Sequence, residues 1–559
     1  MNDEQYRREY GQHLVEQVKK GHMTRRQLLI RASVFGIGAT AAGQLLAACG
    51  GSSSSSSSAS PAASGSGAPA PKTGGTAKVI ISPSITDLDP VTIYDTGGIT
   101  LIQQFCEYLI NLNDDMTLKP VLAESWSPNT KGDVWTFKLR QGVKFNDGSP
   151  FGADDVVTTF DRLCDPKSGS AAQAALAGIL AVGGTKKIDD ATVAFNLEKP
   201  FADFPYLVCQ SSYNTVILSR NYKAPWIKNH VGTGPYLLKS YTAKQSCTAA
   251  KNPTYWRKDA SGTQLPYLDT VEWIMVADQS AQTLQLQSGA ADVVAQTPYQ
   301  GSQPLFADPN LKVSEYPSTG MREVFFNVNE KPWTDYRVRQ AVAWCLDRPA
   351  IIQALFGGKG TLGNDTVFSS LYPNAPTIPD RAQDIAKAKQ LLSDAGYPNG
   401  LTVTLSTEKY LEVPQYAQLI KAQCAPAGIT VNVNLVDYNT WYAGSPKSTP
   451  WLNANFGIVE WGQRPTPAVF IQAMLLPTSA WNSSHWNNKE FVTTFDQYMA
   501  TVDQAARLDL ATKLATLEQN DTPTLQAFWI TQLRTQKKNV YNIIGPGDFY
   551  CDMSEAYIA

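Results

Sequence analysis

Few residues in this sequence have the type and spacing that catalysis requires. Two of the four histidines, His230 and His485, lie beyond the first 48 residues, and neither belongs to an HExxH group of zinc ligands. The GxSxG motif that exposes a serine nucleophile in many hydrolases is absent. These observations predict no catalytic residues, no metal site and no cofactor. They favour a protein that binds its ligand without converting it.

Two short segments resemble catalytic motifs but are better interpreted as helix ends. Residues 357–361 (GGKGT) are similar to a phosphate loop, yet they lack the first glycine of GxxxxGK[ST] and follow a predicted helix. We interpret them as a helix C-cap and turn. Asp154 and Asp155 precede another predicted helix, where negative charge interacts favourably with the helix dipole. We therefore expect a surface first turn there and not a catalytic carboxylate pair.

The N-terminus carries export signals. Thr24-Arg25-Arg26-Gln27-Leu28-Leu29 resembles a twin-arginine motif, with Ile30 where Lys is common. Residues 34–48 form an apolar stretch of 15 residues, which is short for a bilayer core of about 30 Å and typical of a signal peptide. Leu46-Ala47-Ala48-Cys49 resembles a lipobox, so residues 1–48 are predicted to be an export signal and Cys49 to be lipidated. An uncleaved N-terminal anchor is the alternative.

A segment of low complexity follows. Residues 49–75 contain seven consecutive serines and otherwise mostly Ala, Pro, Ser and Gly. Such a composition buries too little apolar surface to fold, and it predicts a disordered tether that reaches roughly 25–30 Å. A tether of this kind suits a binding protein that docks on a membrane partner, and it suits a surface enzyme equally.

Composition limits the class of protein. The chain has 559 residues, enough for two or three lobes, and a formal net charge of −2. Because no basic excess is present, we exclude a nucleic-acid partner. The eight cysteines form no CxxC pair. Cys345 and Cys424 fall on apolar stripes of predicted helices, which indicates buried thiols, and a disulfide between Cys209 and Cys247 is one hypothesis for an extracytoplasmic protein.

Strands and helices alternate from Lys78 onward. Residues 134–139 alternate with period two, which places Trp135, Phe137 and Leu139 on one face. Residues 401–407, 414–427 and 429–436 are predicted to be a strand, a helix and a strand. Other helices are expected after Asp335 and before Gly396 and Pro398. The fold class is therefore α/β with mixed sheets.

Several blocks, taken together, resemble the extracellular solute-binding proteins of family 5, whose members bind oligopeptides, dipeptides or nickel complexes. The resemblance covers nearly the whole chain from about residue 76, although Asn146 stands where relatives often have His. The matching blocks are residues 120–126 (PVLAESW), 135–148 (WTFKLRQGVKFNDG), 153–156 (ADDV), 232–236 (GTGPY), 267–269 (YLD), 337–341 (RVRQA) and 384–400 (DIAKAKQLLSDAGYPNG).

The resemblance implies a periplasmic-binding-protein-like fold, with two lobes built from three domains around a ligand cleft. The first lobe is expected to combine residues 76–105, 218–318 and 532–559. Residues 106–217 form an inserted second domain, and residues 319–531 form the second lobe. Several crossings between the lobes suit hinge closure, in which a ligand stabilises the closed state by contacting both sides.

The resemblance also implies ligand residues at the end of a strand in the second lobe. Peptide-binding relatives have a Trp followed three residues later by an Asp that pairs with the peptide amine. This chain keeps the Trp as Trp461, next to Glu460 and Gly462, but has Arg464 at the acidic position. Arg offers a bidentate fork to carboxylate or phosphate, so we expect a ligand with an anionic or strongly accepting group. The alternative is that Arg464 pairs internally, with Glu460 or Asp95 as partner.

Other expected ligand residues lie in three further segments. Tyr94, Asp95 and Thr96 match the segment that lays backbone along the ligand in relatives, and Trp441 and Trp529 match aromatic walls. Core packing is the alternative for each Trp.

The resulting hypothesis is a lipid-anchored, monomeric solute-binding component of an ABC importer. It would lie outside the cytoplasm, in the periplasm or on the outer face of the membrane, and would deliver a peptide-like or other small polar ligand to the permease subunits. A tethered secreted hydrolase and a ligand-sensing receptor are the alternatives.

Overall fold

The computed structural model describes residues 69–84, 87–445, 448–545 and 551–559, and residues 69–559 form one compact unit. The predicted export signal, the lipobox with Cys49 and most of the predicted tether lie outside the described residues. The body begins before residue 76, because Tyr557 donates to the carbonyl of Pro69 (2.7 Å) and the Gly74 amide donates to Tyr267 (2.8 Å). None of the described helices is long and apolar enough to cross a membrane.

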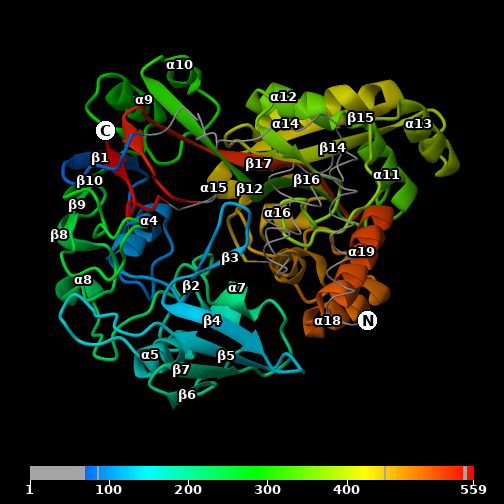
Figure 1. The fold of residues 1–559 in the computed structure, drawn as a ribbon. Helices are drawn as coiled ribbons and strands as arrows, with labels where there is room; N and C mark the ends of the chain where they lie inside the picture. Colours follow the sequence, from blue (N-terminus) through cyan, green and yellow to red (C-terminus); the bar gives the residue numbers. More distant parts are fainter. Residues whose placement is uncertain (1–68, 85–86, 446–447, 546–550) are drawn as a thin grey trace, which may run out of the picture. The chain divides into compact units, whose positions relative to one another are not determined.

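One large mixed sheet runs through the molecule (Figure 1). Parallel and antiparallel neighbours both occur in it, as the α/β prediction with mixed sheets requires. In spatial order its strands are β15 (Ile429–Val436), β14 (Leu401–Glu408), β16 (Phe456–Trp461), β12 (Leu311–Phe326), β17 (Thr524–Lys537), β11 (Val293–Val294), β1 (Thr76–Ile81), β10 (Thr270–Met275), β9 (Ser246–Lys251) and β8 (Tyr236–Thr242), while β13 (Gly360–Leu362) pairs with β17.

The two longest strands connect the two ends of this sheet. In Figure 1 β17, in red, runs from the β1 and β10 end toward the β14 and β16 end, with β12 beside it. The ladder between β12 and β17 shifts register between Pro317, which pairs with Thr531, and Met321, which pairs with Trp529. The expected lobe boundaries at 318/319 and 531/532 thus fall where the pairing is irregular.

A separate four-stranded sheet, cyan in Figure 1, is built from the chain between Ala123 and Asn196. Its order is β4 (Ala123–Pro128), β5 (Val134–Leu139), β7 (Thr192–Asn196) and β6 (Thr185–Asp189), and α5 (Ala153–Cys164) packs on it. Trp135, Phe137 and Leu139 are buried, which confirms the predicted face of β5. The short hairpin of β2 (Ile110–Leu112) and β3 (Leu118–Pro120) is also in this part of the chain.

The predicted strand–helix–strand unit is confirmed as β14, α14 (Val413–Cys424) and β15, with the two strands parallel. The α-helix ends three residues early because Pro426 turns residues 425–427 into a 3₁₀ turn. Helices of the same region are α11 (Tyr336–Cys345), α12 (Arg348–Phe356), α13 (Ile385–Asp394), α18 (Lys489–Ala500) and α19 (Gln504–Asp521).

The helix ends follow the sequence signals. Gly357 adopts a left-handed φ of 59° and caps α12, so the segment that is similar to a phosphate loop is a C-cap, as predicted.

The remaining elements are α4 (Thr96–Phe105), α6 (Gln173–Leu176), α7 (Phe204–Leu207), α8 (Trp226–Asn229), α9 (Gln279–Gln287), α10 (Gln303–Phe306), α15 (Tyr438–Trp441), α16 (Pro450–Asn453), α17 (Pro467–Phe470), a π-helical turn at Ile471–Leu475, β18 (Val540–Tyr541) and β19 (Tyr557–Ile558).

The seven cysteines that the structure describes are all free. Cys345 and Cys424 are buried, as their places on the apolar stripes predict. The hypothesis of a Cys209–Cys247 disulfide is wrong, because each thiol is buried in its own surroundings: Cys209 donates to the carbonyl of Tyr206, and Cys247 lies in the ladder of β9 with β8 and β10.

Candidate functional site

Trp461 ends β16 with its indole held in a fixed orientation. Its Nε1 donates to Oε2 of Glu323 on the neighbouring strand β12 at 2.6 Å. The ring meets Phe470 and Trp481 edge-on, with centroids 6.0 and 5.7 Å away. Because the indole is bonded on one side and packed on two others, one rotamer of Trp461 is selected.

Glu323 holds the Trp461 indole from a buried position, and the sequence analysis did not predict this role. The side chain is fully buried, and burial raises its pKa to about 8, against the opposing effect of hydrogen bonds from Trp461 and Ser483. The carboxyl is therefore mostly protonated at neutral pH. An acid in the apolar run MREVFF was the available sequence signal.

Arg464 is clamped through its backbone to the irregular part of β12. Its amide donates to the hydroxyl of Thr319 (3.0 Å), the same hydroxyl donates to the Arg464 carbonyl (2.7 Å), and the hydroxyl of Tyr372 donates to that carbonyl as well (3.0 Å). The half-buried guanidinium lies with its Cζ 5.8 Å from the Trp461 ring. Trp461 and Arg464 therefore form one cluster, and its anchor is Thr319, between Pro317 and Met321.

This cluster faces residues 106–217. Nε2 of Gln463 donates to Sδ of Met116 at 3.5 Å. Burial raises the pKa of Tyr213, and the positive charge of Arg464 acts on it in the opposite direction. Both interactions join the segment after β16 to the expected inserted domain.

Glu460 lies on the other face of β16. Its carboxylate accepts a hydrogen bond from Tyr438 (3.0 Å) and is 4.0 Å from Arg322, which also pairs with Glu412 (2.8 Å). Because neighbouring residues of a strand point to opposite faces, Glu460 does not share the surface of Trp461. Gly462 is exposed at the strand end.

The residues expected in the first lobe lie at the start of α4. Asp95 caps this helix by accepting from the Gly98 amide (2.8 Å), Tyr94 is 61% exposed, and Thr96 is half-buried.

Trp529 and Trp441 are each 1% exposed. Trp529 sits on β17 opposite Met321, with its ring 6.1 Å from Phe470, so it extends the aromatic cluster of Trp461. Trp441 ends α15, and among the described residues its buried indole N–H has no hydrogen-bond partner. The structure thus places Trp529 next to the cluster, while Trp441 packs elsewhere in the core. A ligand contact by either ring remains a prediction.

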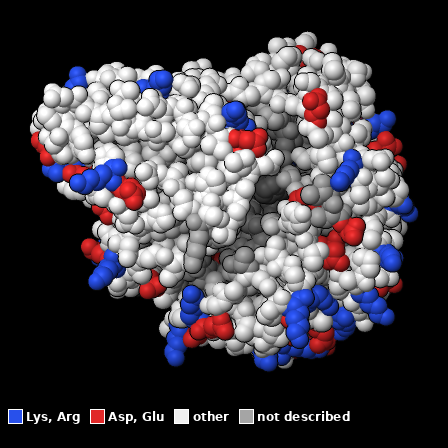
Figure 2. Space-filling view, turned by 180° about the vertical axis from the view of Figure 1, so that it is seen from behind, with Lys and Arg blue, Asp and Glu red and all other residues white. Residues whose placement is uncertain are grey.

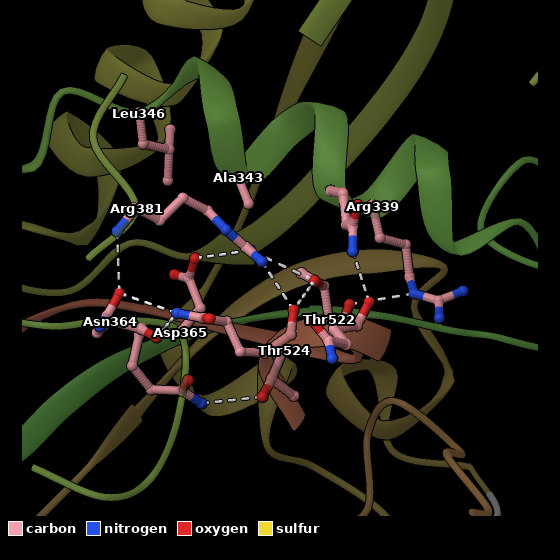
Figure 3. A network of polar contacts seen from close by, with 12 residues as sticks. Arg339, Ala343, Leu346, Asn364, Asp365, Arg381, Thr522 and Thr524 are labelled. Atoms are coloured by element: carbon pink, nitrogen blue, oxygen red, sulfur yellow. Dashed lines mark hydrogen bonds and ion pairs between the residues drawn. The ribbon is translucent and has the colours of Figure 1, made fainter. Parts of the chain in front are cut away.

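A buried ionic network fixes the loop that supports Arg464 (Figure 3). Asp365, fully buried, binds Arg348 (2.6 Å) and Arg381 (2.9 Å). Two residues further on, the amide of Val367 donates to Glu518 (3.1 Å). Tyr372, which bonds to Arg464, follows in the same loop. The network therefore holds the loop that carries Tyr372.

Asp154 and Asp155 form the first turn of α5, as predicted, but Asp155 is buried and not on the surface. Both bind Arg220, at 3.0 and 2.8 Å, and Asp155 also caps the helix by accepting from the Gly152 amide. Within the described ranges, no three His, Cys, Asp or Glu side chains gather in a way that would hold a metal ion.

Figure 2 shows a hollow near the middle of the face opposite to that of Figure 1, with acidic and basic side chains scattered around it and no large patch of one sign.

Comparison with known proteins assigns the family. The family model described as bacterial extracellular solute-binding proteins, family 5, matches residues 117–483, and this chain belongs to that family. The resemblance noted in the sequence is thereby confirmed.

Curated relatives agree with this assignment, and solved structures share the fold. The glutathione-binding protein GsiB of Escherichia coli (strain K12) is 30% identical over 448 residues, which cover 77% of this chain and 84% of GsiB, and the protein from Shigella flexneri matches equally. The unliganded open form of the murein tripeptide binding protein MppA aligns with a TM-score of 0.75 at 23% identity, over 88% of this chain and 99% of that chain. AgaA from A. tumefaciens R10, in complex with agropinic acid, aligns with a TM-score of 0.67 at 24% identity, over 87% and 99%.

Proposed function

We propose that this protein is the solute-capturing component of an ABC importer and that it binds a small polar ligand between its lobes without changing it chemically. The observation that carries the proposal is the cluster of Trp461 and Arg464, whose backbone is clamped to Thr319 where the β12–β17 ladder shifts register. A ligand held by this cluster would favour the closed state if the other lobe contacts it as well.

Closure would take place at the irregular pairing between Pro317 and Met321 and at the facing part of β17. Two strands that connect two bodies permit a hinge, because a few residues absorb the change in backbone angles. The expected first lobe would then move with residues 106–217 against residues 319–531. Tyr94, Asp95 and Thr96 would approach the ligand from the first lobe.

The ligand is proposed to present a carboxylate or another strong acceptor to Arg464. A guanidinium attracts anions and repels a free ammonium group, so a peptide amine is disfavoured there. GsiB is named for glutathione, and AgaA is solved with agropinic acid. Both compounds carry carboxylates, which supports an anionic group on the ligand of the present chain. Glutathione also carries an ammonium group, so the support comes from the carboxylates alone.

The proposed location is outside the cytoplasm, with lipid on Cys49 as the membrane anchor and permease subunits as partners. Support comes from the twin-arginine motif, the short apolar stretch and the lipobox of the N-terminal sequence. Mass spectrometry of the membrane-extracted protein would detect the lipid on a peptide beginning at Cys49. Recovery of an unlipidated chain in the cytosol would contradict this part of the proposal.

Native mass spectrometry of the protein as purified would identify a ligand carried over from the cell. Calorimetry with that compound would then compare the wild-type protein with Arg464→Ala and, as control, Arg337→Ala, a half-exposed arginine of α11 paired with Asp335. Charge-assisted hydrogen bonds are worth about 1.5–3 kcal/mol, so Kd should rise about 10- to 100-fold in Arg464→Ala alone. An unchanged Kd would contradict the role of Arg464, and turnover of the compound would favour a hydrolase.

A further inference from the structure

A cavity of about 230 Å³ lies between residues 106–217 and residues 319–531. We call it the aromatic pocket. Its wall from the first segment consists of Leu118, Trp126, Trp135, Ala202, Asp203, Pro205 and Tyr206, and its wall from the second of Phe368, Tyr372, Pro373, Asn374, Pro465, Thr466, Pro467, Tyr498, Gln504, Arg507, Leu508 and Ala511. Because both walls are needed to form it, the pocket depends on how close the two segments are.

Ring faces and polar atoms line the pocket in similar shares. Trp135 uses its indole N–H to bond to the carbonyl of Phe201 (3.1 Å), and Tyr372 uses its hydroxyl for Arg464. Their exposed surfaces toward the cavity are therefore apolar. A volume of about 230 Å³ is below the roughly 300–1,000 Å³ of sites for drug-sized molecules, and it suits one ring-bearing group.

The polar side chains at the pocket differ in their partners. Asp203 and Arg507 form an ion pair across it (2.5 Å), and the Arg507 guanidinium covers the ring of Tyr498. The hydroxyl of Thr466, a residue 4% exposed, has no hydrogen-bond partner among the described residues. A buried hydroxyl without a partner is uncommon, and it can be satisfied by a ligand atom.

The pocket is continuous with the cluster of Trp461 and Arg464. Arg464 is followed directly by Pro465, Thr466 and Pro467, which are pocket wall. Tyr372 also lines the pocket and bonds to the Arg464 carbonyl. The backbone that carries Arg464 is therefore anchored to one wall of the pocket and leads directly into it.

We propose that the aromatic pocket is a second subsite, which takes an aromatic or large apolar group of a ligand whose anionic group binds Arg464. This inference rests on the proposed function and narrows the substrate class to acids that carry a ring and have no free amine beside the carboxylate. A ring in the pocket touches both segments, so it also stabilises the closed state.

Two probes with the same charge test binding at the subsite separately from binding at the anion site. N-acetyltryptophan and N-acetylalanine both carry a carboxylate and a blocked amine, and only the first has a ring. Calorimetry with the full-length protein should give at least a tenfold lower Kd for N-acetyltryptophan. The variant Ala511→Met adds three heavy atoms to a wall residue that is 2% exposed, so it should remove this preference and leave the Kd of N-acetylalanine unchanged.

The matched control is Ala505→Met on the same helix, α19, at an exposed position outside the pocket, and it should keep the preference. Should Ala511→Met not fold, Thr466→Val replaces it, because it removes the buried hydroxyl that the indole N–H of the ring would bond, and it should weaken only N-acetyltryptophan.

Three outcomes would overturn the subsite. Equal affinities of the two probes for the wild-type protein would refute it, and so would a preference that survives in a folded pocket variant. In both cases the solute-binding function stands. Binding of neither probe would refute the inferred substrate class, while the function itself is decided separately by the carried-over ligand.

Discussion

Replacing Asp203 with asparagine removes one charge from an ion pair that joins residues 106–217 to residues 319–531. Asp203 Oδ2 lies 2.5 Å from Arg507 Nη2, and the two side chains are 8% and 16% exposed. A second link is close by, where the Ala202 amide donates to the carbonyl of Met499 (2.9 Å). The variant leaves the shape of the side chain intact and leaves Arg507 without its anion.

The free-energy cost of Asp203→Asn depends on whether the unpaired charge of Arg507 stays buried or regains water. Removing one partner of a fully buried pair costs about 3–5 kcal/mol. Here the two partners belong to segments that are proposed to separate, so Arg507 can regain water when the protein opens. We therefore expect a cost of about 1–2 kcal/mol, and we expect it to fall on the closed state and not on folding. A shift of 1.4 kcal/mol in the open–closed equilibrium raises the apparent Kd about tenfold.

Small-angle scattering and calorimetry would measure these two effects on the same sample. Asp203→Asn should need more ligand to reach the compact state and should show the weaker affinity, with a thermal midpoint within a few degrees of the wild type. The control is Asp155→Asn, which breaks the pair with Arg220 (2.8 Å) away from residues 319–531. This control should lower the midpoint without changing closure or affinity.

The reasoning would be refuted if Asp203→Asn lowered the thermal midpoint as the control does while closure and affinity stayed at their wild-type values. That result would mean that the ion pair stabilises the fold in every state and does not act on closure.

Two other predictions concern the buried acids behind the site. The pKa of Glu323 is raised from an ordinary 4.5 to about 8, so between these pH values the folded state holds a proton that the unfolded state has lost. The contribution of this residue to stability therefore falls by about 1.4 kcal/mol per pH unit as pH rises from 4.5 to 8. Glu323→Gln should flatten that part of the pH dependence in urea unfolding, and an unchanged slope would contradict the assignment. Asp365→Asn should destabilise the protein by about 3–5 kcal/mol, because it removes the anion that two buried arginines share. Asp154→Asn, at an acid whose side chain is 44% exposed, should cost less than about 1 kcal/mol in the same assay. Equal losses would show that the network of Figure 3 does not stabilise the fold by this amount.

Local periodicity was enough to predict the elements whose partners are near in sequence. The unit of β14, α14 and β15 and the buried face of β5 follow from spacings of 3.6 and 2 residues. The glycine that caps α12 follows from a conformation that glycine adopts readily. Such features depend on fewer than 40 consecutive residues.

The parts of the site that could not be predicted depend on distant residues. Glu323 becomes the partner of Trp461 only because β12 and β16 are neighbours in the sheet, although 138 positions separate the two residues. The aromatic pocket needs walls from two segments whose mutual position no local pattern encodes. For the same reason the Cys209–Cys247 pairing was wrong, since spacing along the chain does not indicate which thiols meet.

Glu460 shows how strand alternation separates neighbours in sequence. Its place beside Trp461 in sequence made it a candidate for the same surface, but the two residues alternate across β16, and Glu460 meets Tyr438 and Arg322 instead.

The central claim is that a ligand closes residues 106–217 against residues 319–531. Spin labels at Ile188→Cys on β6 and Lys389→Cys on α13, both exposed positions, would report the distance between the two segments by pulsed electron resonance. The account predicts a distribution that moves to shorter distances as the carried-over ligand is titrated, with the midpoint of the change at the calorimetric Kd. A distribution that is the same without ligand and at saturation would contradict it.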